Sequence, residues 1–159
     1  MKIAELKVHR AKSAEDIMRI PSGLLRQVGG LDIDKVYENA EALVSSPNVW
    51  IMLLSDVTGH IRAVLWFTID VFENQLVVYL FAVDPEYQSC NLNHARWIGG
   101  FLFNLVVIPE RYRQKIQWLT ERPKLYERFG VKRSRRVILE IDREEYERAV
   151  ETDSVRRCS

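Results

Sequence analysis

The chain has 159 residues, of which 47% are hydrophobic and 28% are charged, and its formal net charge is +1. This length and composition fit one compact domain and exclude a disordered or low-complexity chain. A net charge this close to zero does not by itself point to nucleic acid or a membrane surface as the partner.

The cysteines and the apolar runs argue against two further classes of protein, disulfide-stabilised and membrane-spanning ones. Only Cys90 and Cys158 occur, far apart in sequence, so a disulfide framework is not expected and a reduced compartment is. Residues 1–10 alternate polar and apolar side chains, which is not the pattern of a signal peptide. The apolar runs at 76–83 and 101–108 are shorter than the roughly 20 residues of a membrane-spanning helix. We therefore expect a soluble, cytoplasmic protein.

The first third of the chain predicts one strand followed by two helices. Residues 2–10 alternate apolar and charged side chains, as in a half-buried strand. Ser13 is suited to cap the helix that follows. Asp32 or Asp34 is suited to cap a second helix, which ends near Pro47.

The middle of the chain predicts three consecutive strands. They cover residues 49–54, 61–71 and 75–83, with short turns at Thr58-Gly59 and Glu73-Asn74. Turns this short join antiparallel neighbours, so the three strands form a meander. The third strand is nearly continuous in apolar residues, which predicts a central strand covered on both faces.

The rest of the chain predicts a buried helix, a strand, a short helix, a last strand and a charged C-terminal helix or tail, at residues 92–105, 115–120, 123–129, 137–141 and 142–159. Asp142 and Glu145 have the spacing of a capping box for the terminal helix. The predicted order is β-α-α-β-β-β-α-β-α-β, an α+β fold with a mostly antiparallel central sheet. Residues 1–141 form the predicted domain, and residues 142–159 the tail.

A polar loop, residues 88–94, joins the central strand to the buried helix. It contains Gln88, Ser89, Cys90, Asn91 and Asn93 at the predicted start of that helix. The first turn of a helix presents unpaired backbone N–H groups and a partial positive charge, which together suit an anion such as a phosphate.

Two motifs and the element order carry a resemblance to a known family. Val83, Pro85, Tyr87 and Gln88 fit a V-x-P-x-[YW] strand end followed by a loop of the form [RQ]xxGx[GA]. The stretch LYERFGV, residues 125–131, is similar to an L-Y-x-x-x-G-F signature. Over residues 2–141 the chain thus resembles the GNAT superfamily of coenzyme A-dependent N-acyltransferases.

The resemblance implies an activity and a set of site residues. The implied reaction moves an acetyl group from acetyl-CoA to a primary amine. Tyr126 corresponds to the general acid of the family, and Glu73, Asp84 and Glu86 are candidate bases, of which Glu73 is the predicted catalytic residue. The residues implied in binding acetyl-CoA are Phe81, Ala82, Val83, Gln88, Ser89, Cys90, Asn91, Leu92, Asn93 and His94.

The chain departs from the family at both glycines of the loop, which are Asn91 and Asn93. Asparagine tolerates left-handed backbone better than most residues, but its side chain fills space that glycine leaves to a phosphate. Asn93 could also cap the helix itself. A second interpretation therefore stays open, in which the chain is a catalytically silent GNAT-fold binding or structural protein, of a virus or a mobile element.

A third interpretation rests on the segment 110–136, which holds ten basic residues and three acidic ones. Clustered cations with interleaved aromatic residues suit a nucleic-acid surface, although no recognised binding motif accompanies them. No metal is expected, because His9, His60 and His94 lack metal-ligand spacing among themselves and with the cysteines. The sequence leaves the oligomeric state open.

Overall fold

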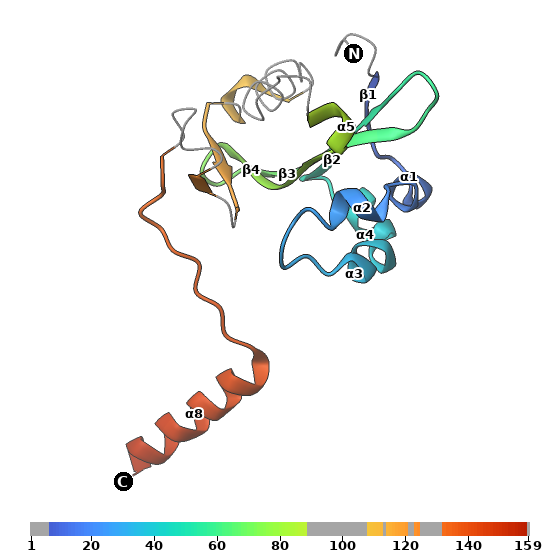
Figure 1. Ribbon diagram of the computed structural model, residues 1–159. Helices are drawn as coiled ribbons and strands as arrows, with labels where there is room; N and C mark the ends of the chain where they lie inside the picture. Colours follow the sequence, from blue (N-terminus) through green and yellow to red (C-terminus); the bar gives the residue numbers. More distant parts are fainter. Residues whose placement is uncertain (1–6, 89–107, 113, 121–122, 125–131, 159) are drawn as a thin grey trace.

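The computed structural model describes residues 7–88, 108–112, 114–120, 123–124 and 132–158 (Figure 1). The predicted helix at 92–105 and most of the short helix at 123–129 lie outside these residues. So do the predicted site residues Ser89, Cys90, Asn91, Leu92, Asn93, His94 and Tyr126.

A five-stranded sheet forms the centre of the fold, with strand order β1-β2-β3-β4-β5 (Figure 1). The strands are β1 Lys7–Arg10, β2 Val49–Ser55, β3 Ile61–Asp70, β4 Gln75–Val83 and β5 Ile116–Trp118. The pairs β1–β2, β2–β3 and β3–β4 are antiparallel, and β4–β5 is parallel. The predicted α+β fold and its three-strand meander are confirmed.

The turns of the meander depend on residues that accept left-handed backbone. Gly59, between β2 and β3, has a φ of 88°, and the carboxylate of Asp56 accepts the Thr58 N–H at 2.9 Å. Asn74, between β3 and β4, has a φ of 53°, a conformation that asparagine adopts more readily than most residues. Asp70 closes that turn by accepting backbone N–H groups within it.

Four short helices cover one face of the sheet: α1 Ala14–Met18, α2 Ser22–Leu25, α3 Ile33–Glu38 and α4 Ala40–Ser45 (Figure 1). The predicted cap of α1 is a full capping box, in which Ser13 Oγ accepts the Asp16 N–H and Asp16 accepts the Ser13 N–H, both at 3.3 Å. Of the two predicted caps for the second helix, Asp32 is the one used.

The second predicted helix is divided into α3 and α4 at Asn39. This residue has φ −97° and ψ 15°, and its side-chain amide donates to the Lys35 carbonyl at 2.8 Å. Short polar side chains that bond to nearby backbone compete with helix geometry. No sequence pattern predicted α2, a single helical turn that begins directly after Pro21.

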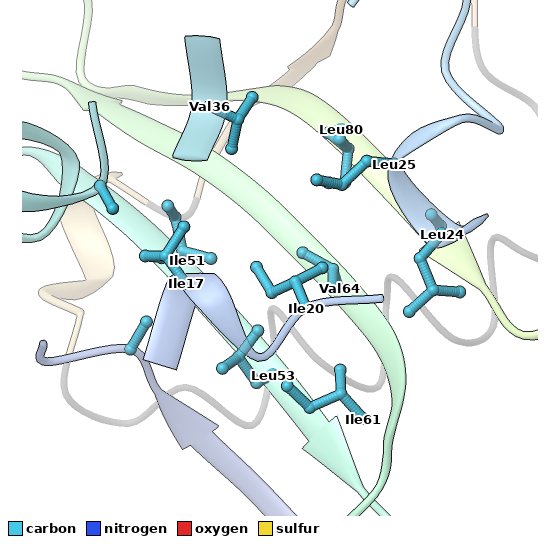
Figure 2. Close-up of a cluster of buried hydrophobic side chains, with 13 residues drawn as sticks. Ile17, Ile20, Leu24, Leu25, Val36, Ile51, Leu53, Ile61, Val64 and Leu80 are labelled. Carbon is cyan, nitrogen blue, oxygen red and sulfur yellow. The ribbon is translucent and has the colours of Figure 1, made fainter. Parts of the chain in front are cut away.

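The core lies on both faces of the sheet. On the helix-covered face, the fully buried Ile17, Leu25 and Leu53 belong to one cluster of apolar side chains (Figure 2). On the other face, Phe67 of β3 and Ile108 are both 0% exposed and belong to a second cluster. Two buried faces explain why the strand sequences are nearly continuous in apolar residues.

The prediction of a last strand at residues 137–141 is wrong. The structure places this segment outside the sheet, and its apolar side chains are exposed to solvent. It leads into α8, Arg143–Cys158, which extends away from the sheet (Figure 1). The predicted cap of α8 is present, because Asp142 accepts the Glu145 N–H at 2.8 Å.

Two further short elements complete the described chain: α5, Pro85–Gln88, and the 3-10 helix η2, Glu110–Tyr112. Among the helices that the structure describes, none combines the length and the apolar character needed to cross a membrane.

Candidate functional site

The predicted cofactor-binding residues Phe81, Ala82 and Val83 form the C-terminal end of β4. They pair with Leu65, Val64 and Ala63 of β3, and all three are buried. Helix α5 begins two residues after the strand and ends at Gln88, the first residue of the predicted phosphate loop.

A β-bulge lies in the middle of β4. Trp66 of β3 pairs with Leu80, and the next residue, Phe67, pairs with Val78, so Tyr79 is an extra residue on β4. A bulge bends its strand and increases its twist. The parallel ladder to β5 covers Leu76–Val78 and ends directly before the bulge. The second half of β4 therefore runs on beyond the part that pairs with β5.

Two long side chains from other parts of the chain hold the end of β4. Gln27, after α2, donates from Nε2 to the Val83 carbonyl at 2.9 Å. Arg62 of β3 donates from Nη1 to Asp84 Oδ2 at 2.9 Å, and the Asp84 N–H donates to the Arg62 carbonyl at 2.7 Å. Asp84 in turn accepts the Glu86 N–H at 3.0 Å, which fixes the start of α5.

Arg62 also connects this end of β4 to the β2–β3 turn. Its Nε donates to Asp56 Oδ2 at 2.8 Å, so one guanidinium joins two carboxylates on different elements. Hydrogen bonds from Thr58 and then from Arg62 lower the pKa of Asp56 below its usual range. The two carboxylates raise the pKa of Arg62. Asp56 therefore stays ionised near neutral pH and serves to position the turn, not to exchange protons.

The Asp56 pKa gives a pH-dependent prediction. Because folding lowers this pKa from 3.8, the ionised carboxylate stabilises the fold at pH values above 3.8, and this stabilisation is lost as the pH falls further. Asp56→Asn cannot ionise, so its free energy of unfolding should lie furthest below wild type at about pH 5 to 7 and approach wild type in acid. Urea denaturation across this pH range measures the difference. A difference in the free energy of unfolding between wild type and Asp56→Asn that stays constant down to pH 3 would contradict the account.

Glu73 lies at the other end of β4. Its carboxylate accepts from Arg136 at 2.7 Å and from Gln75 Nε2 at 3.3 Å, in the turn before the strand. The eight residue steps from Gln75 to Val83 span about 26 Å at the usual rise of a strand. The structure therefore does not bring the predicted base Glu73 together with the predicted cofactor-binding residues Phe81–Val83.

The other two candidate bases, Asp84 and Glu86, lie at the same end of β4 as Phe81–Val83. The Asp84 carboxylate is engaged with Arg62 and with the start of α5. Glu86 is exposed, with its carboxylate 3.9 Å from the Arg62 guanidinium. No cluster of potential metal ligands occurs within the described parts of the chain.

The basic segment 110–136 is described in part. Arg111 lies over the ring of Tyr112, with its guanidinium carbon 4.7 Å from the ring centroid, and Arg136 is paired with Glu73. These two cations thus contact the chain's own side chains. The nucleic-acid interpretation stays a prediction.

Sequence reasoning missed the residues that hold the site, Gln27, Asp56 and Arg62. For two of these residues, the sequence contains a pattern that could have indicated the role. Asp56 stands two residues before Thr58, next to Gly59, which is the pattern of a turn closed by an aspartate side chain. Arg62 is a cation directly before an apolar run, residues 63–67, and a charged residue that is partly buried beside such a run needs a partner. Gln27 lies among loop residues and gave no signal.

Comparison with solved structures shows what this geometry resembles. The aminoglycoside N-acetyltransferase AAC(6')-Iy, in complex with CoA, matches with a TM-score of 0.62 and 12% identity over 87% of this chain and 95% of that one. A ribosomal-protein-alanine N-acetyltransferase from Brucella melitensis biovar Abortus matches with a TM-score of 0.60 and 14% identity over 86% and 99%. A GNAT family acetyltransferase from Staphylococcus aureus matches with a TM-score of 0.62 and 8% identity over 86% and 99%.

The chain therefore has the fold of the GNAT acetyltransferases, as the sequence motifs predicted. The likeness covers most of this chain and most of each neighbour, so it does not rest on one motif alone. No protein-family model and no curated protein sequence matches the chain.

Proposed function

We propose that this chain is an N-acyltransferase that moves an acetyl group from acetyl-CoA to a primary amine. The bulge at Tyr79 is the observation that carries the proposal, because the β4–β5 ladder stops at Val78 while β4 continues to Val83. A bent strand whose second half extends past its parallel neighbour suits an extended ligand with amide groups, which bonds to backbone as a strand does.

In this proposal, backbone groups of Phe81–Val83 hold the acyl-bearing arm of acetyl-CoA, and residues 88–94 hold its pyrophosphate. Gln27 and Arg62 keep the end of β4 in place, because they bond to Val83 and Asp84 from the turn after α2 and from β3. Fixed backbone donors are effective in acyl transfer, since they need no rearrangement when charge develops on the carbonyl oxygen.

Bound acetyl-CoA supplies a thioester. The amine nitrogen attacks the carbonyl carbon of this thioester, and the carbon–sulfur bond breaks. Because Tyr126 lies in the LYERFGV motif, we assign it as the general acid. Its hydroxyl donates the proton that the departing thiolate takes up. Glu73 has no role in the proposal, because it is held at the opposite end of β4 by Arg136. Glu86, which is exposed near the Arg62 guanidinium, is the remaining candidate to accept the amine proton.

The solved neighbours support an amine acceptor. Their names specify acetyl transfer to an aminoglycoside in one case and to the alanine of a ribosomal protein in another. An aminoglycoside and a peptide with a free N-terminal alanine are therefore the first acceptors to test here. The cytoplasmic location stays a prediction.

A thiol-release assay tests the proposal. The purified chain with acetyl-CoA and these amines should release free CoA thiol faster than the uncatalysed reaction. Tyr126→Phe should lower kcat by about 10² to 10⁴, the usual contribution of a general acid. Tyr146→Phe is the matched control, because Tyr146 is exposed on α8, and it should leave kcat unchanged.

Two results would contradict the proposal. Absence of thiol release with every amine, while acetyl-CoA binds, would favour a silent GNAT-fold protein. A Tyr126→Phe variant as active as wild type would remove Tyr126 from the mechanism.

A further inference from the structure

The bulge in β4 turns two consecutive side chains toward the same face of the sheet. Side chains of a regular strand alternate between the two faces, and one extra residue shifts this alternation. Val78 belongs to the buried cluster on the face away from α1–α4, whereas Leu80 belongs to the cluster beneath these helices. The ring of Tyr79 lies 6.4 Å from the ring of Trp66, which packs on the same cluster as Leu80. Tyr79 and Leu80 therefore both face the helix-covered side.

The two neighbours at the bulge differ in burial. Leu80 is 3% exposed and fills the core, whereas Tyr79 stays 44% exposed. The half-buried ring of Trp66 supports Tyr79, with 40° between the two ring planes, an arrangement that is favourable for aromatic side chains. Trp66 is itself fixed in the sheet, because it pairs with Ile51 of β2 and with Leu80 of β4. Trp66 and Tyr79 thus form an aromatic surface on rigid strands.

The position of this aromatic surface follows from the direction of the proposed cofactor. In the proposed acetyl transfer, residues 88–94 hold the pyrophosphate and Phe81–Val83 hold the acyl-bearing arm, so the arm runs backward along β4 toward the bulge. Tyr79 precedes Phe81 by two residues, which is about 7 Å at the usual rise of a strand. The ladder to β5 ends at Val78, directly before the bulge. The amine must therefore approach the acetyl carbon beside Tyr79.

We infer that Tyr79, supported by Trp66, binds the acceptor, and that the acceptor is a primary amine joined to an aromatic ring by a short alkyl chain. This inference rests on the proposed acetyl transfer and names the class of its acceptor. Aromatic rings bind one another in offset or edge-to-face contacts, which a half-exposed tyrosine on a fixed support is able to offer. An ammonium is also attracted to an aromatic face, but the nitrogen that attacks a thioester must be the uncharged amine.

Steady-state acetylation of two amines tests the inference, with thiol release as the readout. The amines are 2-phenylethylamine and n-butylamine, of which only the first carries a ring. Wild type should show a kcat/KM for 2-phenylethylamine about 10-fold above that for n-butylamine. Tyr79→Ala should raise the KM for 2-phenylethylamine by about 10-fold and leave the KM for n-butylamine unchanged. General damage to the fold would affect both amines equally, so the ratio of the two kcat/KM values separates recognition from folding.

Two further variants serve as controls. Tyr79→Phe keeps the ring and removes only the hydroxyl, so it should keep the preference of the wild type. Phe72→Ala removes another exposed aromatic ring, which is 91% exposed in the turn before β4. This turn lies at the opposite end of β4 from Phe81–Val83, so Phe72→Ala should also keep the preference.

Several outcomes would overturn the inference and leave the acetyl transfer standing. One is a wild type that acetylates n-butylamine, or the aminoglycoside kanamycin, as efficiently as 2-phenylethylamine. Another is a Tyr79→Ala variant that keeps the preference for the aromatic amine. If the wild type acetylates none of these amines, the proposed acetyl transfer itself fails, and the inference fails with it.

Discussion

Replacing Phe67 by alanine is expected to lower the free energy of unfolding by about 3–5 kcal/mol, the usual loss for a buried aromatic residue. Phe67 is 0% exposed, and its ring stacks on Trp50 with 6.1 Å between centroids. It also pairs with Val78 at the edge of the bulge, so a cavity here would loosen the bent part of β4. Urea denaturation followed by circular dichroism measures the loss.

Phe72→Ala is the control for this prediction. The Phe72 side chain is 91% exposed, in the turn between β3 and β4, so its removal should change the free energy of unfolding by less than about 0.5 kcal/mol. Equal losses in the two variants would contradict the assignment of Phe67 to the core.

Replacing Arg62 by methionine is expected to weaken acetyl-CoA binding by about 10- to 100-fold, since small misplacements of binding groups have effects of this size. The variant keeps an unbranched side chain but leaves Asp56 and Asp84 without the cation that joins them. Repulsion between these carboxylates should move the end of β4 and the start of α5. Calorimetric titration of acetyl-CoA into wild type and variant measures the change.

Arg19→Met is the matched control for Arg62→Met. Arg19 reaches the same turn, through one exposed hydrogen bond to the Gly59 carbonyl at 3.2 Å, but it does not join two carboxylates. The Arg19→Met variant should bind acetyl-CoA with the affinity of the wild type. If Arg62→Met also bound with wild-type affinity, Arg62 would have no part in positioning the site.

Local signals were enough to predict most of the fold. The period of apolar residues located β2, β3 and β4, and short polar residues located the caps at Ser13 and Asp32. The bulge at Tyr79 could not be predicted, because one extra residue does not disturb a strand that is apolar on both faces. The segment 137–141 misled the prediction, since it has the composition of a strand but no partner within the described sheet.

A linear pattern can indicate residues of the candidate site only where they are neighbours in the sequence. Phe81–Val83, which come directly before the loop motif, are such residues, and their role in binding stays a prediction. The connection from Asp56 through Arg62 to Asp84 joins three separate elements, and its partners depend on register, which a single sequence does not reveal. The position of Glu73 likewise depends on how the chain folds, because this residue lies in the turn before β4, where it pairs with Arg136, and not at the end of β4 that precedes the loop motif.

The central claim is that the end of β4 and the loop after it bind acetyl-CoA. Isothermal titration of acetyl-CoA into the wild-type chain at neutral pH tests it most directly. The account predicts saturable binding of one molecule per chain with a micromolar Kd. Absence of binding heat up to millimolar acetyl-CoA would contradict this claim. The chain would then have the GNAT fold but would not bind acetyl-CoA.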